Sequence, residues 1–337
     1  MNNAARIALN AQTTIPAPAF LVTVDTEGDN LWARPRQTTT ANSAFLPRFQ
    51  ALCEAYKLRP TYLVNHEMAM CPVFREFGRD VLHRNAAEIG MHLHAWDSPP
   101  LVPLTADDSQ NQPYLIEYSA PVMREKIARM TAVLEDTFGV KMTSHRAGRW
   151  GFNGTYAKIL SDAGYLADCS VTPRISWQQC TGDPSQNGGP DYTHFPESPY
   201  FLDLQDIRNE GHSSLLEIPV TSMDVRPRLA RGIAENLGRR SLARRALNRW
   251  FPPVCWLNPI HHSVEMTLRV LQSAAADDRT CVQALHSSEL MPGGSPRYPG
   301  ERDVESLYDG LQRVFEWAGK RFRGATVTEF RREFSAA

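Results

Sequence analysis

The sequence lacks the features that mark several large classes of protein. No window approaches the run of about 18 apolar residues that a transmembrane helix needs, and residues 1–20 contain no continuous apolar signal core. We therefore expect a cytoplasmic protein that contacts the inner membrane face peripherally, if at all. The six cysteines form no C-x-x-C pair and no dense framework, which predicts reduced thiols in the core.

An excess of one charge is absent as well. The chain has 36 basic and 37 acidic side chains, a formal net charge of -1. Without an overall basic excess or a nucleic-acid-binding motif, we expect no nucleic-acid partner. No serine lies in a G-x-S-x-G motif, which argues against a serine hydrolase. The oligomeric state is left open.

Short β-rich runs alternate with amphipathic windows along most of the chain. Helices are predicted at 43–56, 122–138 and 304–322. Strands are predicted at 20–25, 61–65, 88–94, 142–147, 166–171, 215–220, 280–287 and 325–330. Repeated β–α units are typical of a parallel α/β sheet, and seven or eight of them predict a TIM-like barrel.

We expect this barrel to form one domain. It spans residues 19–335, after an N-terminal extension over 1–18. Three long insertions interrupt the β–α rhythm, at 97–120, at 174–214 and, with basic helical character, at 226–258. In a barrel, long loops after the strands usually shape the substrate mouth.

The stretch TVDTEGD, residues 23–29, brings two carboxylates to the end of the first predicted strand. Asp25 and Glu27 share a face if the strand persists. Carboxylates so close repel each other unless a metal ion or an arginine lies between them. The alternative is ordinary turn chemistry, where Asp and Gly are common.

Two histidines end the third predicted strand, in EIGMHLHAW, residues 88–96. His92 and His94 project to the same face of a strand. Parallel barrel strands open onto one mouth, so imidazole and carboxylate ligands would meet there, a donor set that suits zinc or another divalent first-row metal. A single histidine is more often a structural hydrogen-bonding group.

A third polar segment is SHRAGRWGFN, residues 144–153. Arg146 could hold Asp25 ionised and oriented, and Trp150 could form an apolar wall or a platform for a sugar ring. The alternative is a Gly-rich turn with Trp150 in the core.

The last polar segment is LHSSELMPGGSPRY, residues 285–298. His286 ends a buried-looking strand, and a histidine there suits general acid chemistry because its ordinary pKa lies near neutrality. We expect Glu289 to contact the substrate; the alternative is that it is only a polar loop residue.

In this order, the motifs VDTEGD, EIGMHLHAW, HRAGRWG, ADCSVTP and LHSSELMPGGSP resemble those of the polysaccharide deacetylase superfamily, the NodB-homology or carbohydrate esterase 4 group. The WbmS-like deacetylases of bacterial O-antigen clusters are the branch they resemble most. The resemblance covers residues 20–330. It implies a distorted seven-stranded (β/α) barrel that holds a divalent metal, usually Zn²⁺, with Ni²⁺, Co²⁺, Mn²⁺ or Fe²⁺ as alternatives.

The resemblance also implies residue roles. Asp25 corresponds to the general base, Arg146 to the arginine that orients it, and His286 to the histidine that protonates the leaving amine. Asp168, in ADCSV, corresponds to an aspartate that supports the arginine or the base. Trp150 corresponds to an aromatic wall of the substrate groove.

The histidine spacing departs from the superfamily pattern. The common motif is H-x-x-x-H, but the residue four after His92 is Trp96, which cannot bind a metal. The second histidine ligand is therefore His94, or it has been lost. We expect Trp96 to contact the substrate instead.

The carboxylates depart as well. The superfamily's adjacent Asp-Asp is Asp25-Thr26 here, so the resemblance assigns the metal to Glu27. Asp25 binding the metal directly is the alternative, and it would leave the base unassigned.

Together these roles predict metal-assisted N-deacetylation of a sugar in an O-antigen (lipopolysaccharide) type polysaccharide or in its nucleotide- or lipid-linked precursor. An amide is favoured over an ester because its amine must be protonated to leave. One alternative is hydrolysis of the C–N bond of a small or cyclic amide. The other is a non-catalytic carbohydrate-binding remnant.

One segment is strongly basic. Residues 226–251 contain eight arginines and one acidic residue. Apolar side chains recur in it at helical spacing: Leu237, Leu242, Ala246, Leu247 and Trp250. Such a helix could lie on an anionic membrane or contact a pyrophosphate. The alternative is a solvated helix or a subunit contact.

Overall fold

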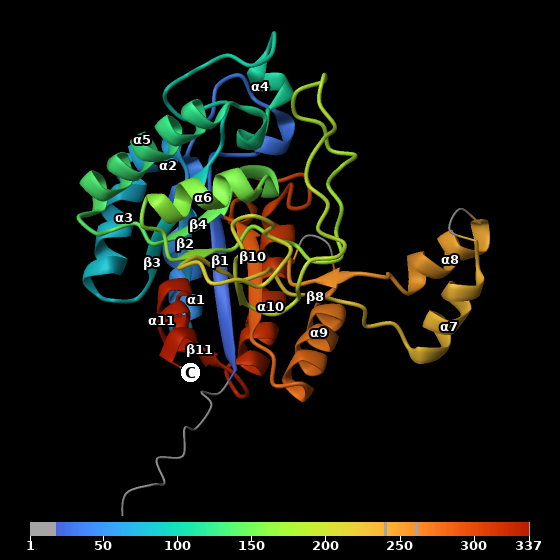
Figure 1. The fold of residues 1–337 in the computed structure, drawn as a ribbon. Helices are drawn as coiled ribbons and strands as arrows, with labels where there is room; N and C mark the ends of the chain where they lie inside the picture. Colours follow the sequence, from blue (N-terminus) through green and yellow to red (C-terminus); the bar gives the residue numbers. More distant parts are fainter. Residues whose placement is uncertain (1–17, 239–240, 260–261, 337) are drawn as a thin grey trace, which may run out of the picture.

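The computed structural model describes residues 18–238, 241–259 and 262–336 (Figure 1). The predicted N-terminal extension, apart from Pro18, lies outside the described residues. Among the helices of the described ranges, none combines the length and apolarity that a membrane crossing requires.

A curled sheet with seven parallel strands is the centre of the fold, in the order β10-β1-β2-β3-β4-β5-β7. Their bounds are β1 Ala19–Thr26, β2 Thr61–Val64, β3 Glu88–Leu93, β4 Ser144–Ala147, β5 Ala167–Asp168, β7 Leu216–Glu217 and β10 Cys281–His286. The short strands β6 (Tyr200–Phe201) and β11 (Arg323–Gly324) add to β7 and β1, and β8 (Ser222–Met223) pairs separately with β9 (Cys255–Trp256).

The sheet closes on itself without a regular ladder between β7 and β10. The Thr221 amide donates to the Val282 carbonyl at 3.1 Å, and the Leu257 amide donates to the Thr221 carbonyl at 2.9 Å. The Ala284 amide then donates to the Leu257 carbonyl at 2.9 Å. A segment after β9 thus fills part of the seam, which confirms the predicted distorted (β/α) barrel.

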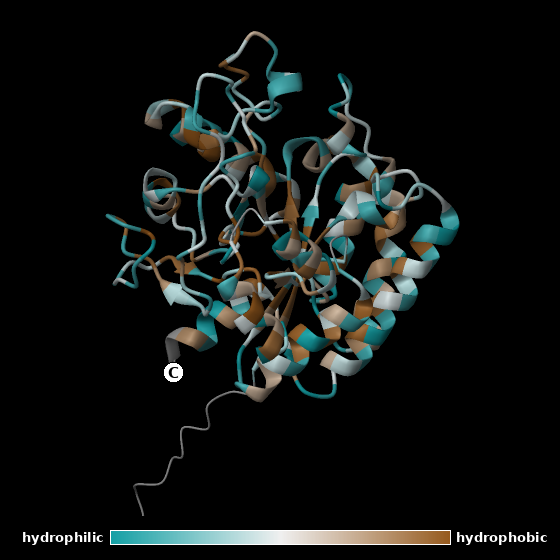
Figure 2. Ribbon diagram, turned by 90° about the vertical axis from the view of Figure 1, so that its right-hand side faces the viewer, coloured by the Kyte–Doolittle hydropathy of each residue, from teal (hydrophilic) through white to brown (hydrophobic). Residues whose placement is uncertain are grey.

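Helices surround the sheet and show their apolar sides to it (Figures 1 and 2). The surrounding helices are α1 Leu46–Ala55, α2 His66–Met70, α3 Pro72–His83, α5 Ala120–Phe138, α6 Gly154–Asp162, α9 Val264–Ala276, α10 Glu301–Ala318 and α11 Val327–Ala336. Helices α4 Asp108–Asn111, α7 Arg228–Asn236 and α8 Leu242–Trp250 lie farther from the sheet (Figure 1). The helices predicted at 43–56, 122–138 and 304–322 correspond to α1, α5 and α10.

Strand β1 alternates between two surroundings, as the period of two in a strand requires. Phe20 and Val22 pack with the main core cluster, which includes side chains of the surrounding helices. Leu21 points instead into a second apolar cluster inside the barrel. The inward row continues with Thr23 and Asp25, so the barrel interior becomes polar toward the carboxyl ends of the strands.

The predicted strand at residues 325–330 is wrong, because helix α11 begins there. The Glu329 amide donates to the Thr326 hydroxyl at 3.3 Å, and the Thr326 amide donates to the Glu329 carboxylate at 3.0 Å. This reciprocal pair is a capping box, which starts a helix whatever the β propensity of the segment. Val327 and Phe330 then pack into the apolar cluster inside the barrel.

The predicted insertions at 97–120 and 174–214 contain only short elements, among them α4 and β6. The basic insertion at 226–258 contains α7, α8 and β9. Instead of one long helix, the basic stretch forms two helices that stand away from the barrel (Figure 1).

The capping box gives the first prediction. Replacing Thr326 with Ala removes the capping hydroxyl and should lower the free energy of unfolding by about 1 kcal/mol, whereas Thr326→Ser keeps a hydroxyl and should cost much less. Urea denaturation of the two variants measures the difference. Equal midpoints for the Ala and Ser variants would show that the cap contributes nothing.

Candidate active site

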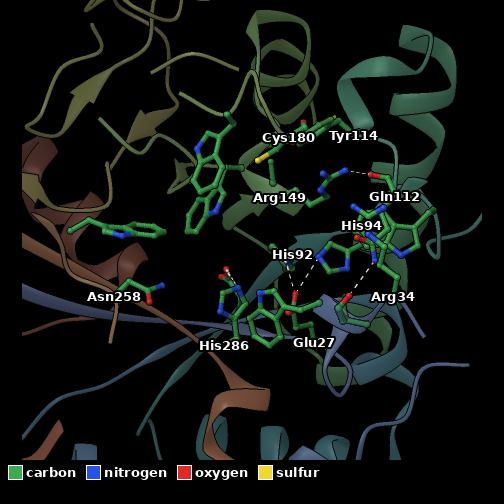
Figure 3. A pocket seen from close by; sticks show the side chains of 18 residues that line it. Glu27, Arg34, His92, His94, Gln112, Tyr114, Arg149, Cys180, Asn258 and His286 are labelled. Atoms are coloured by element: carbon green, nitrogen blue, oxygen red, sulfur yellow. Dashed lines mark hydrogen bonds and ion pairs between the residues drawn. The ribbon is translucent and has the colours of Figure 1, made fainter. Parts of the chain in front are cut away.

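The carboxyl ends of the barrel strands open into a cavity of about 370 Å³ (Figure 3). Five of the residues predicted to act in catalysis or metal binding line it: Asp25, Glu27, His92, His94 and His286. They come from β1, β3 and β10 or from the residues directly after these strands. The shared edge of a parallel barrel brings them together from distant parts of the sequence.

Glu27, His92 and His94 form a buried group that could hold a metal ion. The two Nε2 atoms lie 3.0 Å apart, and Glu27 Oε2 lies 3.3 Å from His94 Nε2 and 3.6 Å from His92 Nε2. Ligands about 2.0–2.2 Å from a tetrahedral ion are separated by about 3.3–3.6 Å. Both distances to Glu27 lie in this range and the distance between the imidazoles is 0.3 Å shorter, so the donor set and its spacing suit a divalent first-row metal after a small adjustment of the two rings.

Contacts behind the two imidazoles orient them toward this point. His92 Nδ1 lies 2.9 Å from the Arg146 carbonyl oxygen, so it donates a hydrogen bond there and leaves the Nε2 lone pair free in the neutral ring. His94 Nδ1 lies 3.8 Å from the Asp97 carboxylate. Trp96 stacks on the His94 ring at 4.3 Å between centroids and lines the cavity.

His94 keeps its predicted direction although β3 ends one residue earlier, at Leu93. Its Nδ1 side faces a second group that could hold a metal, made with Glu67 and Asp97. Burial and the charge of Asp97 raise the pKa of Glu67 to about 8, which favours a neutral carboxyl group. The Glu27 group, whose three residues are all buried, is therefore the better candidate for a metal site.

Asp25 is held by Arg146 rather than by the histidine pair. The guanidinium donates to Asp25 Oδ1 at 2.6 Å, to the Thr23 hydroxyl at 2.7 Å and to the Cys169 carbonyl at 2.9 Å. Burial opposes ionisation of Asp25, but the charges of Arg146, His92 and His286 together outweigh it and keep the pKa below its ordinary value. Asp25 is therefore a carboxylate at neutral pH.

His286 lies on the other side of Asp25, with its Nε2 3.8 Å from Asp25 Oδ2. Its Nδ1 lies 2.6 Å from Glu289 Oε1. Burial alone would lower the pKa of His286, but the nearby charges of Glu27 and Glu289 raise it to about 9. The Trp32 ring contacts the imidazole edge to face at 4.9 Å.

Two predicted roles need correction. Glu289 is completely buried, does not line the cavity and contacts His286 instead. Asp168 forms no hydrogen bond or ion pair with Arg146 or Asp25; its carboxylate lies 2.5 Å from His145 Nδ1 and 3.0 Å from the Ser170 hydroxyl. The Asp168 carboxylate binds His145, the residue before Arg146 on β4, because the pairing of β4 with β5 places His145 opposite Asp168.

The aromatic wall is larger than the sequence suggested. Trp150 lines the cavity as predicted, and it also belongs to a buried apolar cluster, so both interpretations of it hold. Trp177 stacks beside it at 6.2 Å, and Trp256 meets both rings edge to face. Trp177 and Trp256 lie in the insertions at 174–214 and 226–258. The sequence shows that they are tryptophans, which suit the wall of a binding site, but it does not show where they lie in the fold.

The metal group gives the second prediction. Purified protein should contain about one divalent ion per chain, and Glu27→Gln, His92→Ala and His94→Ala should each reduce that content strongly. Elemental analysis by mass spectrometry measures it. His286→Gln is the matched control, since it alters the same cavity and should keep the ion. Full metal content in His94→Ala would remove this histidine from the ligand set.

No family model and no curated protein matches the chain. Solved structures do match. A candidate polysaccharide deacetylase from Mycobacterium smegmatis is 16% identical, with a TM-score of 0.54, over 96% of this chain and 95% of that one. A candidate glycoside hydrolase or deacetylase from Parabacteroides distasonis is 11% identical, with a TM-score of 0.59, over 96% and 72% of the two chains.

A third match is a 4-alpha-glucanotransferase from Thermococcus litoralis, 12% identical, with a TM-score of 0.54, over 96% of this chain and 41% of that one. Enzymes of different activity thus share this architecture, and the reaction has to be argued from the site. The likeness concerns the fold alone: the chain has the distorted (β/α) barrel of these solved structures.

Proposed function

We propose that the protein is a metal-dependent deacetylase that hydrolyses an N-acyl group of a sugar. The observation that carries the proposal is a single cavity in which Glu27, His92 and His94 lie beside an ionised aspartate, Asp25, and a histidine, His286. This set could supply a metal site, a base and an acid, which are the groups that metal-assisted amide hydrolysis uses.

The protein's own side chains would divide the proton transfers. Asp25, kept ionised by Arg146, accepts a proton from the attacking water. His286, whose pKa is raised to about 9, is protonated at neutral pH and donates a proton to the departing nitrogen. A divalent ion held by Glu27 and the two histidines would act as a Lewis acid on the acyl carbonyl and the water.

The acid favours an amide substrate over an ester. An amine leaves poorly unless it is protonated, whereas an alkoxide needs this help less. With Glu27 bound to the metal, Glu289 still lies 2.6 Å from His286 Nδ1 and stabilises the protonated imidazole. Hydrolysis of an N-acetyl sugar would therefore use the metal site, the base and the acid together.

The cavity walls support a sugar. Its volume of about 370 Å³ lies in the range of small-molecule sites, and the faces of Trp96, Trp150 and Trp177 offer apolar platforms for a pyranose ring. Zn²⁺ suits two imidazoles and one carboxylate. The sugar would belong to an O-antigen type polysaccharide or its nucleotide- or lipid-linked precursor, processed in the cytoplasm by a WbmS-like enzyme.

A substrate panel tests the proposal and gives the third prediction. N-acetylated sugars, bound to nucleotide or lipid carriers, should release acetate, and Asp25→Asn and His286→Gln should each lower kcat by about 10² to 10⁴. Acetate release by the metal-loaded protein measures this. Turnover of cyclic amides alone would replace the proposal with the small-amide reaction, and stoichiometric metal without any turnover would favour a binding protein.

The pH profile gives the fourth prediction. If His286 donates the proton, kcat is highest at pH values below the pKa of His286 and falls as the pH rises through that pKa. Glu289→Gln removes a negative charge beside the imidazole, lowers the pKa of His286 and should move the alkaline limb of kcat to lower pH. Glu301→Gln, at an exposed position, is the control. An unchanged limb in Glu289→Gln would exclude His286 as the acid.

A further inference from the structure

Helices α7 and α8 form a hairpin, residues 226–251, that stands away from the barrel (Figure 1). Ala230 and Ala234 of α7 are buried. Arg244 of α8 donates from one guanidinium nitrogen to the carbonyls of Ala234 and Leu237, at 2.8 and 3.0 Å. These contacts join the two helices and leave their outer sides in water.

The outer sides carry positive charge. Eight arginines and one acidic residue within the hairpin give it a formal charge of +7, in a chain whose total is -1. Arg226 and Arg231 are paired with Asp224 outside the hairpin. Other arginines are exposed and make no ion pair with the described acidic side chains: Arg228, Arg245 and Arg249.

The same helices expose large apolar side chains. Leu242, Ala246 and Trp250 follow each other at one-turn spacing on α8, and Leu242 and Trp250 are 79% and 76% exposed. Leu229 on α7 is 77% exposed. These exposed groups alternate with the free arginines, so the hairpin presents an apolar and cationic surface without a partner in the described chain.

Only one kind of partner satisfies both properties. A second copy of the hairpin would bring positive charge against positive charge. A nucleic acid would engage the arginines and leave leucine side chains in water. An anionic bilayer accepts guanidinium groups at its phosphates and takes up Leu and Trp side chains at the boundary of its acyl chains.

We infer that the α7–α8 hairpin docks on an anionic lipid bilayer. The hairpin leaves and rejoins the barrel through the β8–β9 pair, and Trp256 of β9 lines the candidate active site. Docking therefore ties the cavity wall to the membrane surface, where a lipid-linked sugar would be presented. This last consequence rests on the proposed function, whereas the docking itself does not.

Sedimentation with lipid vesicles tests the inference and gives the fifth prediction. The full-length protein should bind vesicles of phosphatidylglycerol and phosphatidylcholine, bind pure phosphatidylcholine weakly, and detach as salt increases. Arg245→Gln with Arg249→Gln should reduce the partition coefficient by about tenfold or more, because each arginine near the surface contributes about fivefold. Leu242→Ser with Trp250→Ser should reduce it comparably.

The control pairs an apolar and a cationic position on barrel helices, Val73→Ser with Arg302→Gln, both exposed, and should bind like the wild type. Circular dichroism melting of each variant checks folding. Absence of binding to anionic vesicles at low salt, or equal binding by all variants, overturns the inference. Tighter binding of single-stranded RNA than of vesicles, or self-association that depends on Leu242 and Trp250, overturns it as well. Acetate release from a water-soluble substrate tests the proposed function separately.

Discussion

The buried guanidinium of Arg146 is the group on which the geometry of the cavity depends. It donates to Asp25 and Thr23 on β1 and to the Cys169 carbonyl just after β5, while its own carbonyl accepts a hydrogen bond from His92 on β3. One residue of β4 thus links the proposed base, one histidine of the candidate metal group and three other strands, β1, β3 and β5. Its charge is fully buried, so losing the Asp25 partner would cost about 3–5 kcal/mol.

The ion pair between Arg146 and Asp25 also explains why Asp25 and Glu27, only two residues apart, have different surroundings. Asp25 points inward and meets the arginine, whereas Glu27, two residues on, reaches the imidazoles at 3.3 and 3.6 Å. Each negative charge has its own positive partner or donor set, which removes the repulsion expected of an unpaired couple. The alternative in which Asp25 binds the metal is disfavoured, because Asp25 is in neither of the groups of described residues that have metal-ligand spacing.

Much of this arrangement could be predicted because strand ends follow simple rules. Residues that alternate on a parallel strand reach one mouth, so Asp25, His92, Arg146 and His286 meet as expected. The supporting contacts could not be predicted, because they depend on long-range packing. Lys126, on an amphipathic helix, looks like a surface residue, yet it is buried and donates to three carbonyls of the loop after β3.

The failed expectations have local causes. The segment at 325–330 has a strand-like composition, but the capping box between Thr326 and Glu329 starts a helix there. The sequence predicts that Glu289 contacts the substrate, but a 3₁₀ turn after β10 places it next to His286, away from the cavity. In both places a hydrogen bond three residues along the chain outweighed the pattern of side-chain types.

The H-x-H spacing of His92 and His94 follows from the turn after β3. Because β3 ends at Leu93, the chain turns directly after the metal group, and the Ser98 amide returns to the His94 carbonyl at 3.2 Å. A histidine four residues after His92 would fall inside this turn, where Trp96 lies instead, stacked on His94. The H-x-H pattern and Trp96 are thus linked. The early turn places the His94 imidazole beside that of His92, and Trp96, which stands where the superfamily has its second histidine, lines the cavity instead.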